Sequence, residues 1–414
     1  MKKLISLMLV LVMALTFVAC GSKTETKTET TTNTETKTET TTTNTETTDD
    51  EIIVGSIQDI SSTTSVMGLM LAEGIRWQVQ TVNDNGGING RKIKLLEYDS
   101  KANVDETINA YKRLVGEGAV AVIGPHQSNI GVAIATIVNE EKVPYLTNAN
   151  DQRVARQGET GFGDPWPYSF TCQPSLYVMG AVMARYALEE LGYTKFGVLY
   201  RSDNSYSVSL YDSFKAYCDV YGGEIVAVET FLSTDTDYKT MLSKLIKEDI
   251  DCLYCPNYTA ELVVITQQAR SLGYEGIMIN GLDSAPPFSE LCGPEADDVI
   301  YLSNIDMNDP DILAVVDEFR AATGNTEPNQ LNKFCLGYDM MGIVVEALKV
   351  SDGGDDAEAF RSAIENTTDY NGLTGTITLD PATHQPEPME LIMHQVIDGE
   401  DVLLMPYTAE PVIK

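Results

Sequence analysis

The fold of this chain is decided by the stretch Ala119-Val-Ala-Val-Ile-Gly-Pro-His-Gln-Ser-Asn-Ile-Gly-Val-Ala-Ile-Ala-Thr-Ile-Val-Asn-Glu-Glu-Lys-Val-Pro-Tyr-Leu-Thr-Asn-Ala-Asn-Asp151. Its first five residues are apolar, which is typical of a parallel strand that is buried on both faces. A glycine and a proline end that strand, and apolar residues at helical spacing follow from Ser128. A second strand is predicted to begin at Val143. The stretch therefore predicts a strand, a turn, a helix and another strand.

Ser128 lies at the turn where the predicted helix begins. A hydroxyl group and the free backbone N–H groups of a helix start form a site for a carboxylate. One hypothesis is that this turn binds the acidic end of a small ligand. The alternative is an ordinary capped helix in an α/β protein, and the stretch alone leaves both interpretations open.

Strands and helices alternate over most of the remaining chain. Before the opening stretch, the periodicity predicts strands at 51–58 and 93–98 and helices at 67–82 and 105–116. After it, predicted helices at 176–191, 204–221, 238–248 and 260–272 alternate with strands at 195–200, 224–231, 251–255 and 276–280. Further helices are predicted at 311–323, 334–349 and 356–365, and strands at 374–379 and 389–397. This order predicts an α/β fold with two doubly wound, parallel-sheet lobes.

Two such lobes place a ligand at the carboxyl ends of their strands. The segments expected at these ends are Ser128 and residues 147–151, 201–206, 257–258 and 281–283. This placement follows from strand direction and not from a catalytic motif.

The composition excludes several classes of function. The formal net charge is −33, of which the first fifty residues contribute −2 and residues 51–414 the remaining −31. Such a charge argues against nucleic acid, whose binding needs a basic surface, and against a resting place on anionic lipid. Cys252 and Cys255 form a Cys-x-x-Cys pair, but on the predicted strand their side chains point to opposite faces about 10 Å apart. We therefore expect structural thiols there and no disulfide bond.

The first fifty residues differ from the rest of the chain. Lys2 and Lys3 precede an apolar run that is short for a membrane span, and small residues then flank Cys20. This pattern resembles a bacterial lipoprotein signal peptide of residues 1–20, in which Cys20 becomes the lipidated N-terminus; the alternative is a plain secretory signal. Residues 21–50 are rich in Thr and Glu and are predicted to form a disordered tether. We expect an extracytoplasmic protein anchored to the cell membrane by a lipid on Cys20.

An enzymatic function is the weaker interpretation. His126, Ser128 and Asp151 are close in sequence, but no Gly-x-Ser-x-Gly elbow is present. His384 and His394 lack metal-ligand spacing, and phosphate-loop and dinucleotide fingerprints are absent. The sequence therefore predicts no catalytic residues, no metal and no cofactor.

Four motifs carry a family resemblance. Residues 82–96, Val-Asn-Asp-Asn-Gly-Gly-Ile-Asn-Gly-Arg-Lys-Ile-Lys-Leu-Leu, resemble a signature of the substrate-binding proteins of branched-chain amino-acid ABC importers. The Val-Ile-Gly-Pro stretch that leads to Ser128 and the segments 143–147 and 373–380 are similar to the same family. The resemblance implies the type I periplasmic-binding-protein fold, with a hinge between the lobes. It also implies an N-terminal lobe of residues 51–170 plus about 305–385 and a C-terminal lobe of 171–304 plus about 386–414.

The resemblance implies a ligand site with contributions from both lobes. In the N-terminal lobe the ligand carboxylate would meet Ser128 and its backbone N–H, and the backbone carbonyl of Ala149 would also contact the ligand. In the C-terminal lobe the matching residues are Tyr206 and Tyr258, with Asp283 at the ligand ammonium.

Two positions depart from the family pattern. Asp151 replaces the usual hydroxyl residue, so it either favours a basic or amine-bearing ligand or turns away to cap its own backbone. Met67 replaces an aromatic residue, which implies a more adaptable pocket.

The resemblance further implies the solute-binding component of an ABC importer, which would act as a monomer and capture an amino acid or similar small polar ligand by hinge closure. Its partners would be the permease and ATPase subunits, with no nucleic acid. The alternative is a ligand-sensing receptor module that passes occupancy to a separate signalling partner.

Overall fold

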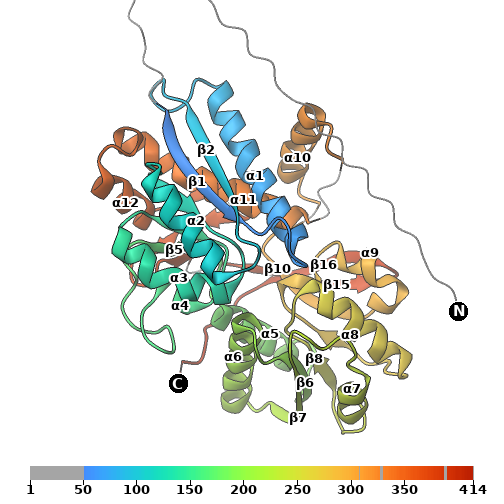
Figure 1. The fold of residues 1–414 in the computed structure, drawn as a ribbon. Coiled ribbons are helices and arrows are strands. Elements are labelled where there is room, and N and C mark those ends of the chain that lie inside the picture. Colours follow the sequence, from blue (N-terminus) through green and yellow to red (C-terminus); the bar gives the residue numbers. More distant parts are fainter. Residues whose placement is uncertain (1–50, 307, 327–329, 387–388, 414) are drawn as a thin grey trace, which may run out of the picture. The chain divides into compact units, whose positions relative to one another are not determined.

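Two large β-sheets with helices packed against them make up most of the described part of the chain, which also contains two two-stranded sheets (Figure 1). The structure is a computed structural model that describes residues 51–306, 308–326, 330–386 and 389–413. The predicted signal peptide and tether lie outside these residues. The two mostly parallel sheets confirm the predicted α/β fold with two lobes.

The first sheet has five parallel strands in the order β2-β1-β3-β4-β5. They are β1 (Ile52–Gln58), β2 (Ile93–Asp99), β3 (Ala121–Ile123), β4 (Tyr145–Thr147) and β5 (Ser169–Thr171). The helices of this part are α1 (Ser65–Asp84), α2 (Val104–Gly116), α3 (Ser128–Glu141), α4 (Gln152–Ala155), α11 (Leu331–Val350) and α12 (Ala357–Glu365). Helix α11 lies in sequence between β10 and β15 of the second sheet but packs on α1 and the first sheet. We call these elements the first lobe.

The second sheet has seven strands in the order β16-β15-β10-β9-β8-β6-β7. They are β6 (Lys195–Arg201), β7 (Glu224–Phe231), β8 (Cys252–Tyr254), β9 (Met278–Ile279), β10 (Val299–Ser303), β15 (Leu391–Ile397) and β16 (Glu400–Tyr407). With it lie α5 (Leu176–Glu189), α6 (Ser205–Tyr221), α7 (Lys239–Leu245), α8 (Thr259–Ser271) and α9 (Phe288–Cys292). We call these elements the second lobe. Helix α10 (Pro310–Thr323) packs instead with Phe334 of α11.

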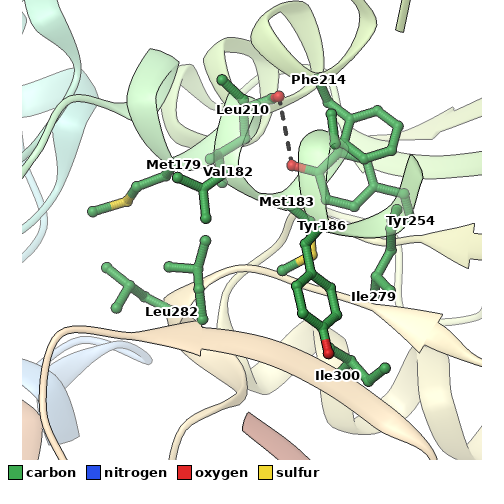
Figure 2. Packing of buried hydrophobic residues seen from close by; sticks show 14 of the residues in the cluster. Met179, Val182, Met183, Tyr186, Leu210, Phe214, Tyr254, Ile279, Leu282 and Ile300 are labelled. Atoms are coloured by element: carbon green, nitrogen blue, oxygen red, sulfur yellow. Dashed lines mark hydrogen bonds between the residues drawn. The ribbon is translucent and has the colours of Figure 1, made fainter. Parts of the chain in front are cut away.

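The apolar faces of α5 and α6 pack on the second sheet to form its core (Figure 2). The Phe214 and Tyr254 rings stack with centroids 4.1 Å apart, and the Tyr254 hydroxyl donates a hydrogen bond to the Leu210 carbonyl at 3.5 Å. Leu282, which follows β9, belongs to this core and also lines the cavity described below. The core thereby fixes one wall of the site.

The glycine-rich motif closes the turn between α1 and β2. Gly86 and Gly87 have φ angles of 105° and 78°, which residues with a side chain rarely adopt. The Asn83 side chain both donates to the Ile93 carbonyl and accepts from the Ile93 amide, at 2.8 Å each. The motif therefore has a structural role, because it sets where β2 begins.

The end of the chain differs from the sequence-based expectation. The single strand predicted at 374–379 is wrong: β12 (Gly375–Ile377) pairs with β11 (Tyr370–Gly372), and β13 (Leu379–Asp380) pairs with β14 (Gln385–Pro386). The strand is interrupted at Thr378, whose hydroxyl accepts a hydrogen bond from the Asp369 amide. Strand β15 pairs antiparallel with β10 of the second sheet, and β16 pairs antiparallel with β15.

The described residues show no disulfide bond, no helix suited to span a membrane and no cluster of metal ligands. Cys252 and Cys255 are buried and unpaired, and so are the other four described cysteines. Among the described helices, none combines the length and the apolar character that a membrane crossing requires. The described residues also contain no group of three or more His, Cys, Asp or Glu side chains placed to hold a metal ion.

Candidate ligand-binding site

A small cavity lies where the carboxyl ends of strands from both sheets meet. Its volume is about 10 Å³, which suits a single water molecule and is far too small for an amino acid. Its walls are Met67, His126, Asn148, Asn150, Gln173, Tyr206, Tyr258, Leu282, Asp283 and Lys333. All of them except Lys333 lie in segments that follow a strand of one of the two sheets. A larger ligand would enter only if these walls moved apart.

Four of the seven expected ligand residues line this cavity, namely Met67, Tyr206, Tyr258 and Asp283. The other three, Ser128, Ala149 and Asp151, are buried but are not among its walls.

Two stacked tyrosines form the wall from the second lobe. The Tyr206 and Tyr258 rings have centroids 4.9 Å apart at an angle of 19°. Tyr206 is held at the start of α6, where the Asn204 side chain caps the helix and accepts from the Tyr206 amide at 2.8 Å. Neither phenolic hydroxyl forms a hydrogen bond of 3.5 Å or less within the described part of the chain. The Tyr206 hydroxyl nevertheless lies close enough to the Asp283 carboxyl group to oppose the rise in its pKa. Because buried hydroxyls normally find partners, both groups are available to a ligand.

Asp283 supplies the negative charge of the cavity. It lies in the short 3-10 turn η1 (Leu282–Ser284) that follows β9, and the Thr259 hydroxyl donates to its backbone carbonyl at 2.7 Å. Burial raises the pKa of Asp283 above its usual range, and the positive charge of Lys333 opposes that shift. A cationic group of a ligand would stabilise the ionised form of this carboxyl group, which burial disfavours.

Lys333 supplies a positive charge that the sequence-based interpretation misses. It lies in the first turn of α11, and only 5% of it is exposed. Its ammonium forms no ion pair or hydrogen bond with the described residues. Its charge nevertheless acts to lower the pKa of His126 and opposes the rise in the pKa of Asp283.

The close packing of α1 and α11 explains where Lys333 lies. A side chain at Gly74 would start 2.0 Å from the Phe334 carbonyl oxygen, and one at Gly337 would start 2.1 Å from the Leu71 carbonyl oxygen. Both glycines are therefore required for this approach, which brings the first turn of α11 to the cavity beside Met67. The sequence did contain a signal for Lys333. A lysine at the N-terminus of a predicted helix is unfavourable to the helix dipole, so its presence there suggests another role.

His126 is a neutral group in the wall. It follows β3, and its ring meets the Tyr258 ring edge to face at a centroid distance of 6.4 Å. Burial, reinforced by Lys333, lowers the pKa of His126 to about 3. Neither ring nitrogen has a hydrogen-bond partner among the described residues, so His126 bonds neither Ser128 nor Asp151 and no triad is assembled.

Side-chain amides complete the wall from the first lobe. The Asn150 amide donates to the Met179 sulfur at 3.2 Å. By contrast, the Asn148 oxygen and the Gln173 nitrogen are buried and without a partner in the described structure. Asn148 lies in the loop 147–151 that the sequence placed at a strand end. Gln173 follows β5, a strand that the periodicity did not reveal.

Ser128 begins α3, but its hydroxyl does not cap the helix. Gln127 occupies the cap position, and the Ser128 hydroxyl is buried with no partner among the described residues. Ala149 packs beneath α3, and its amide donates to the Thr147 hydroxyl at 2.9 Å. The helix start thus keeps a buried, unused hydroxyl two residues after His126.

Asp151 is turned away from the cavity. Its carboxylate accepts from the Arg153 amide at 3.0 Å and from the Arg153 guanidinium at 2.9 and 2.6 Å. It also accepts a hydrogen bond at 3.1 Å from the Ser209 hydroxyl of α6, in the second lobe. Of the two interpretations of Asp151, this geometry favours the one in which it caps its own backbone.

Comparison with known proteins identifies the family. A model of the family described as periplasmic binding protein matches residues 51–400. The Leu/Ile/Val-binding protein BraC3 of Rhizobium johnstonii is 22% identical over 331 residues, which are 79% of this chain and 87% of that protein. The leucine-specific-binding protein of Salmonella typhimurium is 23% identical over 257 residues, 62% of this chain and 64% of that protein.

Solved structures share the fold. The substrate-binding protein LivJ of Streptococcus pneumoniae, in complex with isoleucine, has a TM-score of 0.76 and 24% identity over 87% of this chain and 100% of its own. A solute-binding protein of R. palustris, in complex with benzoate, has a TM-score of 0.76 and 18% identity over 87% of this chain and 97% of its own. The chain belongs to the periplasmic binding protein family.

Proposed function

We propose that this protein is the extracytoplasmic solute-binding component of an ABC importer and that it captures an amino acid or a similar small polar ligand. One observation carries the proposal: strands of both sheets deliver buried polar groups without partners in the described structure into one cavity. Buried groups of this kind are costly unless they are paired, so a ligand with matching polar groups explains them.

The ligand is captured by closure of a hinge between the lobes. The first lobe receives the carboxylate at the start of α3, where the Ser128 hydroxyl is unused. The Ala149 carbonyl, after the next strand, accepts a hydrogen bond from an N–H group of the ligand. The second lobe then brings Tyr206 and Tyr258, and Asp283 meets the ammonium. In this proposal Asp151 supports the closed state through Ser209 and does not touch the ligand.

The lipid anchor on Cys20 and the tether of residues 21–50 would hold a monomer near its permease and ATPase partners. Such tethering raises the local concentration of the binding protein at the transporter. The lobe boundaries near residues 170, 305 and 385 belong to the same proposal.

The ligand class needs a test because proteins of this fold bind different compounds. Among the similar structures, LivJ is in complex with isoleucine and the R. palustris protein is in complex with benzoate. A calorimetric panel on the purified protein would include aliphatic, polar, acidic and basic amino acids, amides, polyamines and benzoate. We expect at least one amino acid to bind. Binding of no small molecule at millimolar concentration would refute the proposed function.

A ligand-sensing receptor module is the alternative, since the same fold and site would serve a separate signalling partner. Reconstitution with the permease and ATPase distinguishes the two. Ligand-dependent stimulation of ATP hydrolysis supports transport, and its absence with a ligand-binding protein would favour sensing.

A further inference from the structure

Two buried side chains of opposite charge face the same cavity without forming an ion pair. Asp283 comes from the second lobe and Lys333 from α11 of the first, with exposed fractions of 4% and 5%. The charge of Lys333 is nevertheless felt at Asp283, where it opposes the rise in pKa that burial causes. No ion pair closer than 4.0 Å joins Lys333 to any carboxylate of the described residues. The cavity therefore lies between two separated charges.

An unpaired ammonium is costly to bury. Removing a charged group from water costs several kcal/mol per ion, and this cost opposes folding unless a partner compensates it. Position adds to this penalty, because Lys333 lies at the N-terminal end of a 20-residue helix, where the helix dipole disfavours a cation. A lysine in this environment is explained if an anion binds to it.

The proposed function already accounts for the two charged groups of a neutral amino acid. Its carboxylate lies at the start of α3 and its ammonium at Asp283. Lys333 is then left without a partner among the described residues. A second acidic group on the ligand would satisfy it.

We propose that the ligand is an amino acid with an acidic side chain and that Lys333 binds its side-chain carboxylate. This inference rests on the proposed function and narrows it to one substrate class. Lys333 thereby becomes the residue that determines specificity.

The other polar walls agree with an acidic side chain. His126 is neutral, and with Asn148 and Gln173 it presents polar atoms that have no partner in the described structure. An aliphatic side chain would leave these atoms and the Lys333 ammonium unpaired, which a binding site penalises strongly. A basic ligand would be repelled by Lys333. Asp151, which offered the opposite preference, is neutralised by Arg153 outside the cavity wall.

The acidic surface of the protein does not contradict this assignment. Residues 51–414 carry a net charge of −31, but exposed charges are screened over a Debye length of about 8 Å at physiological ionic strength. A buried ammonium that touches the ligand is screened far less. The overall charge would slow the encounter with an anion, whereas Lys333 would set how tightly the bound anion is held.

Calorimetry on the purified protein tests the inference with L-glutamate, L-aspartate, L-glutamine, L-leucine, L-lysine and glutarate. We expect the acidic amino acids to bind best and glutarate, which lacks an ammonium for Asp283, to bind weakly. The variant Lys333→Met should weaken glutamate or aspartate binding about ten- to a hundredfold and should leave glutamine binding unchanged or improved. The matched control is Lys349→Met, which removes an exposed lysine near the other end of α11 and should change neither.

The outcomes separate this inference from the proposed function. If glutamine or leucine binds more tightly than both acidic amino acids, or if Lys333→Met leaves acidic affinity intact, the inference is wrong and the solute-binding function stands. If none of the compounds binds, the proposed function itself is in question. Thermal unfolding of ligand-free Lys333→Met adds a readout: an unchanged or raised midpoint is expected, and a large drop would show that Lys333 is a structural counter-ion of Asp283.

Discussion

Asp283 must be ionised to bind an ammonium group, and its burial works against ionisation. Because the pKa of Asp283 in the free site is raised above its usual range, a proton competes with a cationic ligand at mildly acidic pH. Ligand binding would lower that pKa, so the affinity for an amine-bearing ligand should fall as the pH drops through the raised value. His126 does not titrate in this range, since its pKa is about 3.

Asp283→Asn should therefore weaken binding of the best-binding amino acid about ten- to a hundredfold at neutral pH and should remove the loss of affinity that protonation of Asp283 causes at acidic pH. Isothermal titration calorimetry at several pH values measures both effects. Asp249→Asn, which alters an exposed carboxylate of the same lobe paired with Lys195, serves as the control. A profile of the variant as steep as that of the unaltered protein would assign the titration to another group.

The sequence placed three residues of the second lobe at the cavity but did not predict His126, Gln173 or Lys333 as walls. Tyr206, Tyr258 and Asp283 lie in the cavity wall because strand direction alone sends them there. Lys333 enters the wall through the crossing of α1 and α11, which depends on glycines far apart in the sequence. Asp151 leaves it because Arg153 and the distant Ser209 bind its carboxylate. Such contacts cannot be inferred from local sequence.

At the scale of elements, one buried carboxyl group connects α11 to the β11–β12 hairpin. Asp339 accepts hydrogen bonds from the amides of Leu373 and Thr374 at 2.8 and 2.7 Å and from the Thr374 hydroxyl at 2.7 Å. Burial outweighs these bonds and raises the pKa of Asp339 to about 6. The folded state thus binds the proton more tightly than the unfolded state, so the stabilising effect of this group is complete below about pH 4 and is lost as the pH rises toward 6.

The variant Asp339→Asn removes this titration and one hydrogen-bond acceptor. The stability difference between the unaltered protein and the variant should be largest near pH 4 and shrink by up to roughly 3 kcal/mol by pH 7. Urea unfolding at several pH values measures it. Asp369→Asn, at an exposed position in the adjoining turn, should show no such trend. A pH-independent difference for Asp339→Asn would mean that Asp339 ionises normally in the folded protein.

Helices and strands could be predicted from the sequence where burial alone determines their pattern of apolar residues. Continuous apolar runs such as β1 and β3 are recognisable because both faces of a central parallel strand are buried. Strand β5 is three residues long and polar at both ends, so periodicity does not reveal it. The division between β12 and β13 depends on side-chain hydrogen bonds of the tertiary structure, which sequence patterns do not reveal.

At the scale of the whole described molecule, a few contacts join the two lobes near the cavity. The contact of α3 with α6 and the edge-to-face pair of His126 and Tyr258 bring the lobes together. The Ser209–Asp151 hydrogen bond adds a directional contact between buried groups. In the proposed hinge closure, such a contact forms only when the lobes are closed, so it raises the closed population and with it the apparent affinity for the ligand.

Ser209→Ala should therefore weaken ligand binding about fivefold to tenfold without touching the cavity wall, because Asp151 keeps its bonds to Arg153 and loses only the bond across the lobes. Calorimetry gives the affinity, and small-angle scattering of the ligand-free protein should show a larger radius of gyration for the variant. Ser213→Ala is the matched control, because the Ser213 hydroxyl of the same helix bonds the Tyr177 carbonyl within the second lobe. It should lower stability and leave affinity unchanged. If both serine variants bind ligand equally well, closure is governed by the cavity contacts and the ligand alone.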